Sequence, residues 1–197
     1  MQRFFDASLE RGHEGVVAKR LDSGYEPGAR NFNWIKLKRA YQSELNDTVD
    51  VVIVGYLRGR GYRTRFGIGS MLGAVYDEGT DTFKSIGKIG SGLSDENWVR
   101  MRELLDTEKV DHQPARVDSR LVPDVWVEPK FVVTVLADEI TRSPIHTAAL
   151  DEQGRGLALR FPRVVGFIRD DKSAEDATTA KEIVEMFSQQ RRSASKT

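Results

Sequence analysis

Cysteine is absent from the 197 residues, and no apolar run approaches the roughly 20 residues that cross a bilayer. Without cysteine, the chain can form neither a disulfide nor a thiolate metal site. The three histidines, His13, His112 and His146, lack the spacing of a metal-binding motif. The first residues also lack the long apolar segment of a signal peptide. We therefore expect a soluble, intracellular, globular protein with no membrane partner.

A net charge is also missing, because 30 Lys and Arg balance 30 Asp and Glu. This balance argues against a uniformly basic nucleic-acid binder, but the charges are unevenly placed. Residues 58–65 hold four arginines and no acid, and residues 155–172 hold five bases against two acids. Residues 77–128 instead hold twelve acids against seven bases. One face is therefore suited to phosphate and another to water.

The hydrophobic pattern changes near residue 50. Before it, the spacing predicts an amphipathic helix over 2–11 and two antiparallel strands joined by a loop, which together are too small to be stable alone. After it, a Ser N-cap and an apolar stripe predict a helix over 94–105, and helical spacing returns over 177–190. The predicted strands are 15–19 and 33–38 in the first part, and 51–57, 70–76, 83–89, 125–137 and 157–168 in the second.

Five short strands with a helix between the third and fourth are typical of the oligonucleotide-binding (OB) fold. We therefore expect a mainly β fold: a five-stranded OB barrel with an inserted helix and a C-terminal helix, preceded by the small two-stranded piece. The predicted boundaries are 1–45 for that piece, 46–175 for the barrel, and 176–197 for the last helix and tail.

Two charged motifs lie in the first part of the chain. Glu14-Gly-Val-Val-Ala-Lys19 places a carboxylate before a strand, which suits Mg²⁺ because this ion prefers oxygen ligands; an exposed acid at a strand end is the alternative. Trp34-Ile-Lys-Leu-Lys38 puts Lys36 and Lys38 on one face of a strand. Their ammonium groups repel each other unless an anion lies between them, and a solvated edge strand is the alternative.

Two more basic motifs lie in the second part. Arg160-Phe-Pro-Arg163 is followed by Arg169-Asp-Asp-Lys172, which combines the planar fork of arginine with the mobile point charge of lysine. The alternative is a basic strand end paired with Asp170 and Asp171. The stretch from 58 to 65 joins the first two barrel strands, where loops flank the usual binding face, so it predicts contact with nucleic acid; a flexible solvated loop is the alternative. Its four candidate DNA-binding residues are Arg58, Arg60, Arg63 and Arg65.

In this order, the motifs resemble those of ATP-dependent DNA ligases of the archaeal and eukaryotic type, specifically their C-terminal part, from about residue 4 to about residue 190. The resemblance implies that residues 1–45 are the end of the nucleotidyltransferase (adenylation) domain. It also implies that the barrel moves over ATP, with a linker near 39–49. By resemblance, Glu14 lies near the catalytic metal, and Arg169 and Lys172 act on the leaving pyrophosphate. The implied ATP-binding residues are Lys19, Arg30, Lys36, Lys38, Arg169 and Lys172.

Such ligases use a lysine nucleophile in a Lys-x-Asp-Gly motif, which does not occur in this sequence. We therefore expect the chain to be inactive alone and to contribute phosphate, metal and DNA contacts to an enzyme that seals nicks through an AMP intermediate. Many family members also carry an acid at the position of Thr134, so the ion pair that this acid would make is in doubt.

The resemblance implies the cofactors ATP and Mg²⁺ and a role in DNA replication, repair and recombination. The implied partners are nicked duplex DNA and the N-terminal part of the ligase, with a sliding clamp as a further candidate. The implied location is the cytoplasm of a prokaryote, in association with the nucleoid. Two alternatives stay open: a stand-alone OB-fold DNA-binding module, and a fragment of an RNA ligase or capping-type nucleotidyltransferase.

Overall fold

The computed structural model of the chain describes residues 2–11, 13, 15–24, 33–38 and 47–194. Within these ranges, the side chains of Gln2, Leu9, Glu10, Lys36, Lys38 and residues 191–194 lie outside the description. The chain divides into two compact units, residues 1–42 and residues 43–197. None of the described helices is long and apolar enough to span a membrane.

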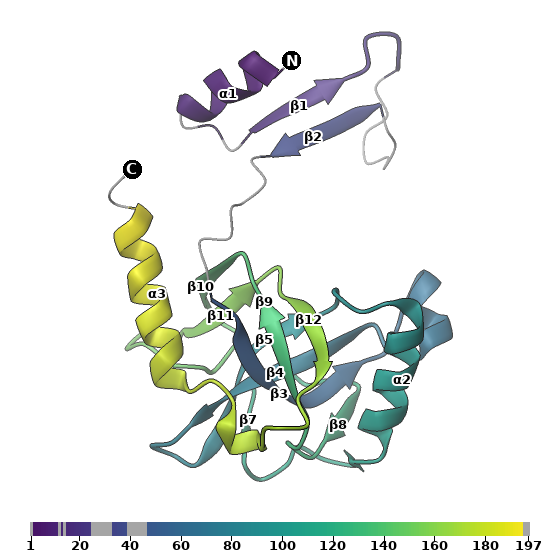
Figure 1. The fold of residues 1–197 in the computed structure, drawn as a ribbon, viewed down its shortest axis with the longest axis vertical. Coiled ribbons are helices and arrows are strands. Elements are labelled where there is room, and N and C mark those ends of the chain that lie inside the picture. Colours follow the sequence, from purple (N-terminus) through teal and green to yellow (C-terminus); the bar gives the residue numbers. More distant parts are fainter. Residues whose placement is uncertain (1, 12, 14, 25–32, 39–46, 195–197) are drawn as a thin grey trace. The chain divides into compact units, whose positions relative to one another are not determined.

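The first unit contains a helix, α1 (Gln2–Glu10), and two strands, β1 (Gly15–Lys19) and β2 (Trp34–Lys38). The strands are antiparallel, with Val17 opposite Lys36 and Lys19 opposite Trp34 (Figure 1). The predicted helix and both strands are confirmed, each end lying within one residue of its predicted position.

The second unit is a curled β-sheet with two α-helices and two short 3-10 helices in its described residues (Figure 1). In chain order its elements are β3 (Val49–Leu57), η1 (Gly61–Phe66), β4 (Ser70–Asp77), β5 (Thr82–Ile89), α2 (Asp95–Asp106), β6 (Lys109–Val110), β7 (Val117–Asp118), β8 (Val125–Val127), β9 (Val132–Leu136), β10 (Glu139–Ser143), β11 (Gly156–Arg160), β12 (Arg163–Ile168), η2 (Ala174–Asp176) and α3 (Ala180–Ala194).

Five strands of this unit lie side by side in the order β12-β9-β3-β4-β5. The sheet curls back on itself, because the Val164 N–H at the start of β12 donates to Ser91 O just after β5, at 2.9 Å. Gly92 permits this approach: its φ is 102°, and a Cβ there would lie 2.1 Å from Val164 O. Helix α2 falls between the third and fourth of these strands in chain order. The predicted fold class, a mainly β OB-type barrel with an inserted and a terminal helix, is confirmed.

Two of the predicted strands are wrong as single elements. The predicted strand 125–137 is broken into β8 and β9, which both pair with β3. Pro129 lies between them and has no N–H to donate to a strand ladder. The predicted strand 157–168 is broken at Phe161, whose φ is 50°, and at Pro162. There the chain leaves its pairing with β10 and joins β9.

The terminal helix begins at Ala180 rather than at residue 177. The preceding residues are extended, since Thr179 forms a bridge with Tyr76 and the Thr178 N–H donates to Asp50 O at 2.9 Å. At the other end, the side chain of Gln190 bonds the backbone of Ile140 at 2.8 and 3.2 Å. Helix α3 is therefore held to the barrel at both of its ends.

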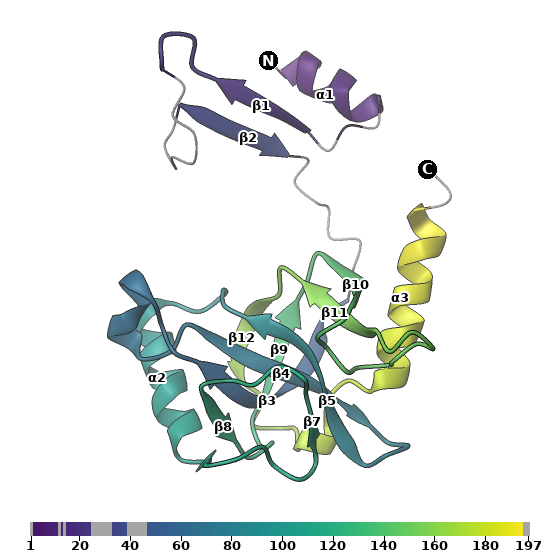
Figure 2. The ribbon, with the colours of Figure 1, turned by 180° about the vertical axis from the view of Figure 1, so that it is seen from behind.

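Buried side chains cover both faces of β3, as expected for a strand in which successive residues point to opposite faces. Val51 and Ile53 belong to one apolar cluster, which also includes Trp98 of α2 and Ile183 of α3. Val52 and Val54 belong to a second cluster on the other face. Figures 1 and 2 show α2 and α3 at opposite ends of this unit, and residues of both helices pack into the first cluster. Polar side chains near the strand ends thus project from a rigid, packed frame.

Candidate functional site

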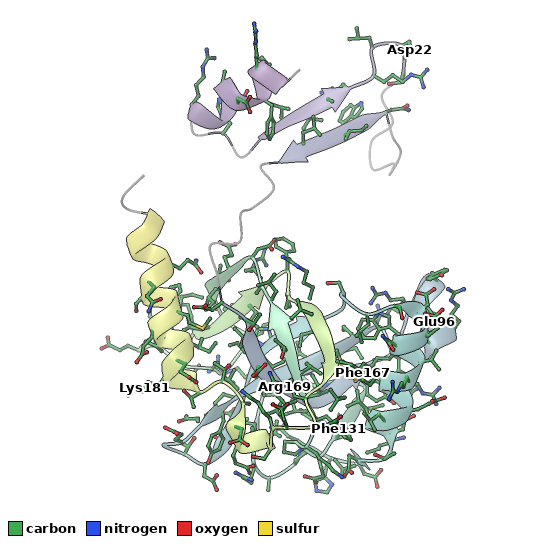
Figure 3. The ribbon with its side chains drawn as sticks, in the orientation of Figure 1. Asp22, Glu96, Phe131, Phe167, Arg169 and Lys181 are labelled. Carbon is green, nitrogen blue, oxygen red and sulfur yellow. The ribbon has the colours of Figure 1, made fainter. Side chains whose placement is uncertain are left out.

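Arg169 lies just after strand β12, where Figure 3 labels it. Lys172 follows three residues later in the chain. The Arg169 N–H donates to Val132 O of β9 at 2.9 Å, which fixes the backbone at this point. The Lys172 N–H then donates to Arg169 O at 3.4 Å, so the two cationic residues sit in one turn. Both line the same cleft, together with Lys130 and Phe131. The structure thus brings together the two residues that the sequence motif pairs.

Asp50 lies at the centre of this pair. Its Oδ2 accepts a hydrogen bond from Lys172 Nζ at 2.6 Å and lies 3.4 Å from Arg169 Nη1. Its side chain is only 12% exposed, against 29% for Lys172 and 36% for Arg169. Burial raises the pKa of the Asp50 carboxyl, but hydrogen bonds from Lys172 and Thr134 and the nearby positive charges more than offset this, so its pKa lies below the ordinary value. Asp50 is therefore a charged anchor for both cations.

Thr134 pairs with Asp50 across the β3–β9 ladder, and its hydroxyl donates to Asp50 Oδ1 at 2.6 Å. The sequence left the ion pair at this position in doubt, because Thr134 stands where an acid is common. The structure shows that the carboxylate comes from the opposite strand. Sequence motifs did not single out Asp50, because only the register of two distant strands places it beside Arg169 and Lys172.

Arg169 is also held by its neighbour Asp171. Its Nε and Nη2 donate to the two carboxylate oxygens of Asp171 at 2.8 and 2.7 Å, the bidentate geometry that suits a guanidinium. The bond from Arg169 lowers the pKa of Asp171 to about 2, and the same pair raises the pKa of Arg169. All three guanidinium nitrogens therefore face protein partners. The Asp171 side chain is 65% exposed, so it is the partner that an incoming anion can most easily replace.

The first arginines of the same motif make other contacts. Arg163 Nη1 donates to Asp138 Oδ1 at 2.9 Å, and Arg160 Nε lies 3.9 Å from Glu139 Oε1. The Arg160 guanidinium also lies 4.9 Å from the ring centroid of Phe161. These two residues are therefore tied to the β9–β10 corner rather than to the Asp50 cluster.

The basic stretch between β3 and β4 is more ordered than a solvated loop, because residues 61–66 form η1. Arg63 Nη1 donates to Gly69 O at 2.5 Å, and its guanidinium lies 5.2 Å from the Trp98 ring centroid. Arg65 pairs with Asp95 at 2.5 Å. Arg58 and Arg60 are exposed, and within the described part of the chain their guanidinium groups have no protein partner. The four arginines therefore fall into an engaged pair and an open pair.

The first unit carries the other candidates. Lys19 is exposed, and its Nζ lies 4.2 Å from the ring centroid of Trp34, a cation–π contact. Lys36 and Lys38 alternate with Leu37 along β2, but their side chains lie outside the described residues. Glu14 and Arg30 lie outside them altogether. No group of three or more His, Asp or Glu side chains with the spacing of a metal site occurs among the described residues. The Mg²⁺ site at Glu14 therefore stays a prediction.

Comparison with known proteins gives two family matches. The family described as "ATP dependent DNA ligase C terminal region" matches residues 64–172, and the "ATP dependent DNA ligase domain" matches residues 1–38. The first match lies within the second unit of the chain, and the second match lies within the first unit.

Individual relatives agree with these matches. The chain is 59% identical over 192 residues to a probable DNA ligase of Dictyoglomus thermophilum, covering 98% of this chain and 33% of the relative. It is 50% identical over 191 residues to a DNA ligase of Sulfurisphaera tokodaii, covering 95% of this chain and 31% of the relative. Among solved structures, mycobacterial DNA ligase D complexed with ATP and MES is 29% identical, with a TM-score of 0.46, over 90% of this chain and 50% of that chain. The chain spans about a third of the length of these curated relatives, and it belongs to the family of ATP-dependent DNA ligases, whose C-terminal region it matches.

Proposed function

We propose that this chain is the C-terminal part of an enzyme that seals nicks in duplex DNA through an AMP intermediate. In this proposal residues 1–45 end the adenylation domain, residues 46–175 form the barrel, and residues 176–197 form the closing helix and tail. The observation that carries the proposal is the convergence of Arg169 and Lys172 on Asp50 at the edge of a cleft, in a chain of the ATP-dependent ligase family.

The Asp50 cluster explains how the two cations could serve a phosphate. Two cations, Arg169 and Lys172, balance two carboxylates, Asp50 and Asp171, so the cluster is neutral as it stands. When the exposed Asp171 carboxylate is replaced by phosphate oxygens, the planar fork of Arg169 is free to bind them with two parallel hydrogen bonds. Asp50 stays in place and keeps both cations aimed at one point. Cations held in this way stabilise the negative charge on a leaving pyrophosphate.

The proposed ATP contacts in the first unit are Lys19, Arg30, Lys36 and Lys38, and those in the barrel are Arg169 and Lys172. Glu14 would lie near Mg²⁺, which neutralises phosphate charge when bound.

Contact with DNA is proposed through Arg58 and Arg60 first, because their guanidinium groups are open, and through Arg63 and Arg65 second. Arginines on a loop neutralise phosphates without reading the base sequence, so no sequence preference is expected. Nicked duplex DNA and the N-terminal part of the ligase are the proposed partners. A sliding clamp, association with the nucleoid, and roles in replication, repair and recombination stay predictions from the family resemblance.

A fusion protein tests this function. The N-terminal two thirds of the Dictyoglomus thermophilum relative is joined to this chain, which is 59% identical to the region that it replaces. With labelled ATP and Mg²⁺, we expect the fusion protein to form a covalent AMP adduct and to seal nicked DNA. The 197-residue chain alone should form no adduct, because its sequence has no Lys-x-Asp-Gly nucleophile.

Two outcomes would contradict the proposal. One is a covalent label on the chain alone that survives denaturation. The other is a folded fusion protein, checked by its thermal unfolding transition, that forms the adduct but seals no DNA nick. Sealing of nicked RNA in preference to DNA would favour the RNA ligase alternative, and DNA binding without any adduct in the fusion protein would favour a stand-alone binding module.

A further inference from the structure

A second cleft lies on the barrel between β3, η1, α2 and β6, at residues that the ligase motifs, Arg58 apart, do not include. We call it the Arg102 cleft. Three cations from three different segments line it, together with one carboxylate and one tyrosine hydroxyl. Its lining residues are Tyr56, Arg58, Gly67, Arg102, Asp106, Lys109 and Val125.

Strand pairing brings distant residues to this cleft. Tyr56 of β3 lies opposite Val125 of β8, and β8 in turn pairs with β6, where Lys109 lies opposite Val127. Lys109 therefore comes to the same end of the sheet as Tyr56. On α2, Arg102 and Asp106 are one helical turn apart, which places both on the same face of the helix.

Arg102 is held in place before any ligand binds. Its Nε donates to Asp106 Oδ2 at 3.1 Å, and the other oxygen of Asp106 accepts the Tyr56 hydroxyl at 2.6 Å. Burial and this bond to Asp106 raise the pKa of Tyr56 to about 12, so the hydroxyl stays protonated and keeps donating at neutral pH. Both oxygens of the Asp106 carboxylate are therefore already engaged.

Gly67 contributes to the same arrangement. Its φ is 72°, and a Cβ at this position would lie 2.8 Å from Arg102 Cδ, so the arginine side chain lies directly across the glycine backbone. The terminal nitrogens of Arg102 have no protein partner in the described part of the chain. The side chain is 45% exposed, so these nitrogens are open to a ligand.

The charges in the cleft do not balance. Among the residues that line it, Arg58, Arg102 and Lys109 outnumber Asp106, which gives the lining an excess of two positive charges. The nearby Asp124 accepts the backbone N–H of Arg58 at 2.7 Å, and no ion pair joins it to a cation of the cleft in the described residues. Cations gathered in one concave site attract an anion with several acceptor oxygens.

We propose that the Arg102 cleft binds a backbone phosphate of duplex DNA. Arg58 belongs both to this cleft and to the open arginine pair, so a strand that contacts Arg60 and Arg58 continues directly onto Arg102 and Lys109. The DNA-binding surface then extends from η1 onto α2 and β6. This inference rests on the proposed function, because it adds a contact to the same DNA surface.

Salt-dependent binding tests the cleft. The affinity of the 197-residue chain for a fluorescent nicked duplex is measured by anisotropy over a series of salt concentrations. We expect Lys109→Gln and Arg102→Gln each to flatten the dependence of log affinity on log salt by about one unit, since each phosphate contact contributes a slope near −0.9. Arg100→Gln is the matched control, because Arg100 lies on α2 but points to the Phe167 ring, 4.8 Å from its centroid. This control should keep the wild-type slope.

Each outcome decides the proposal. Lys109 is exposed and its side chain has no partner in the described residues, so Lys109→Gln tests the cleft even if Arg102→Gln does not fold. Suppose that Lys109→Gln keeps the wild-type slope while the double variant Arg58→Gln with Arg60→Gln flattens it. That result would contradict phosphate binding in the Arg102 cleft and would leave the proposed DNA contact through Arg58 and Arg60 intact. A weaker affinity at an unchanged slope would also contradict a phosphate contact. Absence of any DNA binding by the wild-type chain would overturn both.

Discussion

The carboxylate of Asp50 accepts a hydrogen bond from the Lys172 ammonium at 2.6 Å, although 122 residues separate them in the sequence. Asp50 lies in the first strand of the barrel and Lys172 follows the last strand of the curled sheet. The bond therefore ties the phosphate-binding motif to the barrel frame. Asp50 acts as a positioning residue, since in the proposed function it holds the cations and does not itself touch the nucleotide.

Replacing Asp50 by Asn should destabilise the barrel. The substitution leaves Lys172 and Arg169 without their shared, mostly buried counter-charge. We expect a loss of about 1–2 kcal/mol in the free energy of unfolding, after allowing for solvent screening of the partly exposed partners. Urea unfolding of the chain measures it. Asp171→Asn is the control, and its effect should be smaller because the Asp171 side chain is 65% exposed. Equal losses for the two variants would argue against Asp50 as the anchor.

Wild type and Asp50→Asn should also differ in how their stability responds to acid. The pKa of Asp50 is lowered in the folded protein, so its contribution to stability is present above its unfolded pKa of about 3.9 and is lost as the pH falls through the folded value. The difference in unfolding free energy between wild type and Asp50→Asn should therefore shrink below about pH 4. Urea unfolding from pH 7 to pH 2.5 checks this, and a difference that stays constant to the lowest pH would refute it.

The burial of His146 should cause a second loss of stability as the pH falls. Its side chain is 6% exposed, and its Nδ1 has no hydrogen-bond partner in the described part of the chain. Burial, assisted by the charge of Lys88, lowers its pKa to about 4. The free energy of unfolding therefore holds its full value above the unfolded pKa of about 6.5. It falls by up to about 3 kcal/mol as the pH drops towards 4, because the unfolded chain takes up a proton that the buried imidazole does not.

Unfolding at several pH values tests this assignment. His146→Gln should remove most of the loss in unfolding free energy between pH 6.5 and pH 4. His112→Gln, at an exposed position, should show the same pH dependence of unfolding free energy as the wild type. If both variants kept the wild-type pH dependence, the buried histidine would not be its source.

Substitutions of the open arginines and of the engaged arginines should have different effects on DNA binding and on stability. Arg58→Gln with Arg60→Gln should flatten the salt dependence of DNA affinity by up to about two units and leave stability unchanged, because both guanidinium groups are open. Arg63→Gln should instead cost about 1 kcal/mol of stability, since it removes a hydrogen bond to Gly69 O, and should flatten the slope less. Anisotropy titrations and urea unfolding measure the two effects. The reverse order would show that the arginines engaged in the free chain are the ones that bind DNA.

The sequence predicted most of the fold because its signals are local. A short apolar run with β-branched residues located β1, and alternating side chains located β2. The Ser94 cap with the stripe of Trp98, Met101, Leu104 and Leu105 located α2. The breaks at Pro129 and at Phe161-Pro162 were missed, because both interrupt long apolar runs that satisfy strand preferences on either side. A strand that changes its pairing partner at a corner carries no clear local signal of that change.

The candidate site was predictable only in part. The motif containing Arg169 and Lys172 is a local pattern and was found. Asp50 was not, since its role depends on the register that places it opposite Thr134. The Arg102 cleft was missed for the same reason, because its lining residues come together only through the pairing of β3 with β8 and of β8 with β6. Neither did the sequence distinguish Arg63 and Arg65 from Arg58 and Arg60, because the difference lies in contacts with α2 and with the backbone before β4.

The most direct test separates two steps in the fusion protein with the Dictyoglomus thermophilum relative. Arg169→Ala and Lys172→Ala are compared with Lys181→Ala, an exposed control on α3. Formation of the AMP adduct and sealing of nicks that already carry AMP are measured separately. If these cations act on the leaving pyrophosphate, both variants should slow the adduct step by about a hundredfold or more and the sealing step much less, and the control should slow neither. Equal slowing of both steps would contradict the account and assign the motif a structural role only.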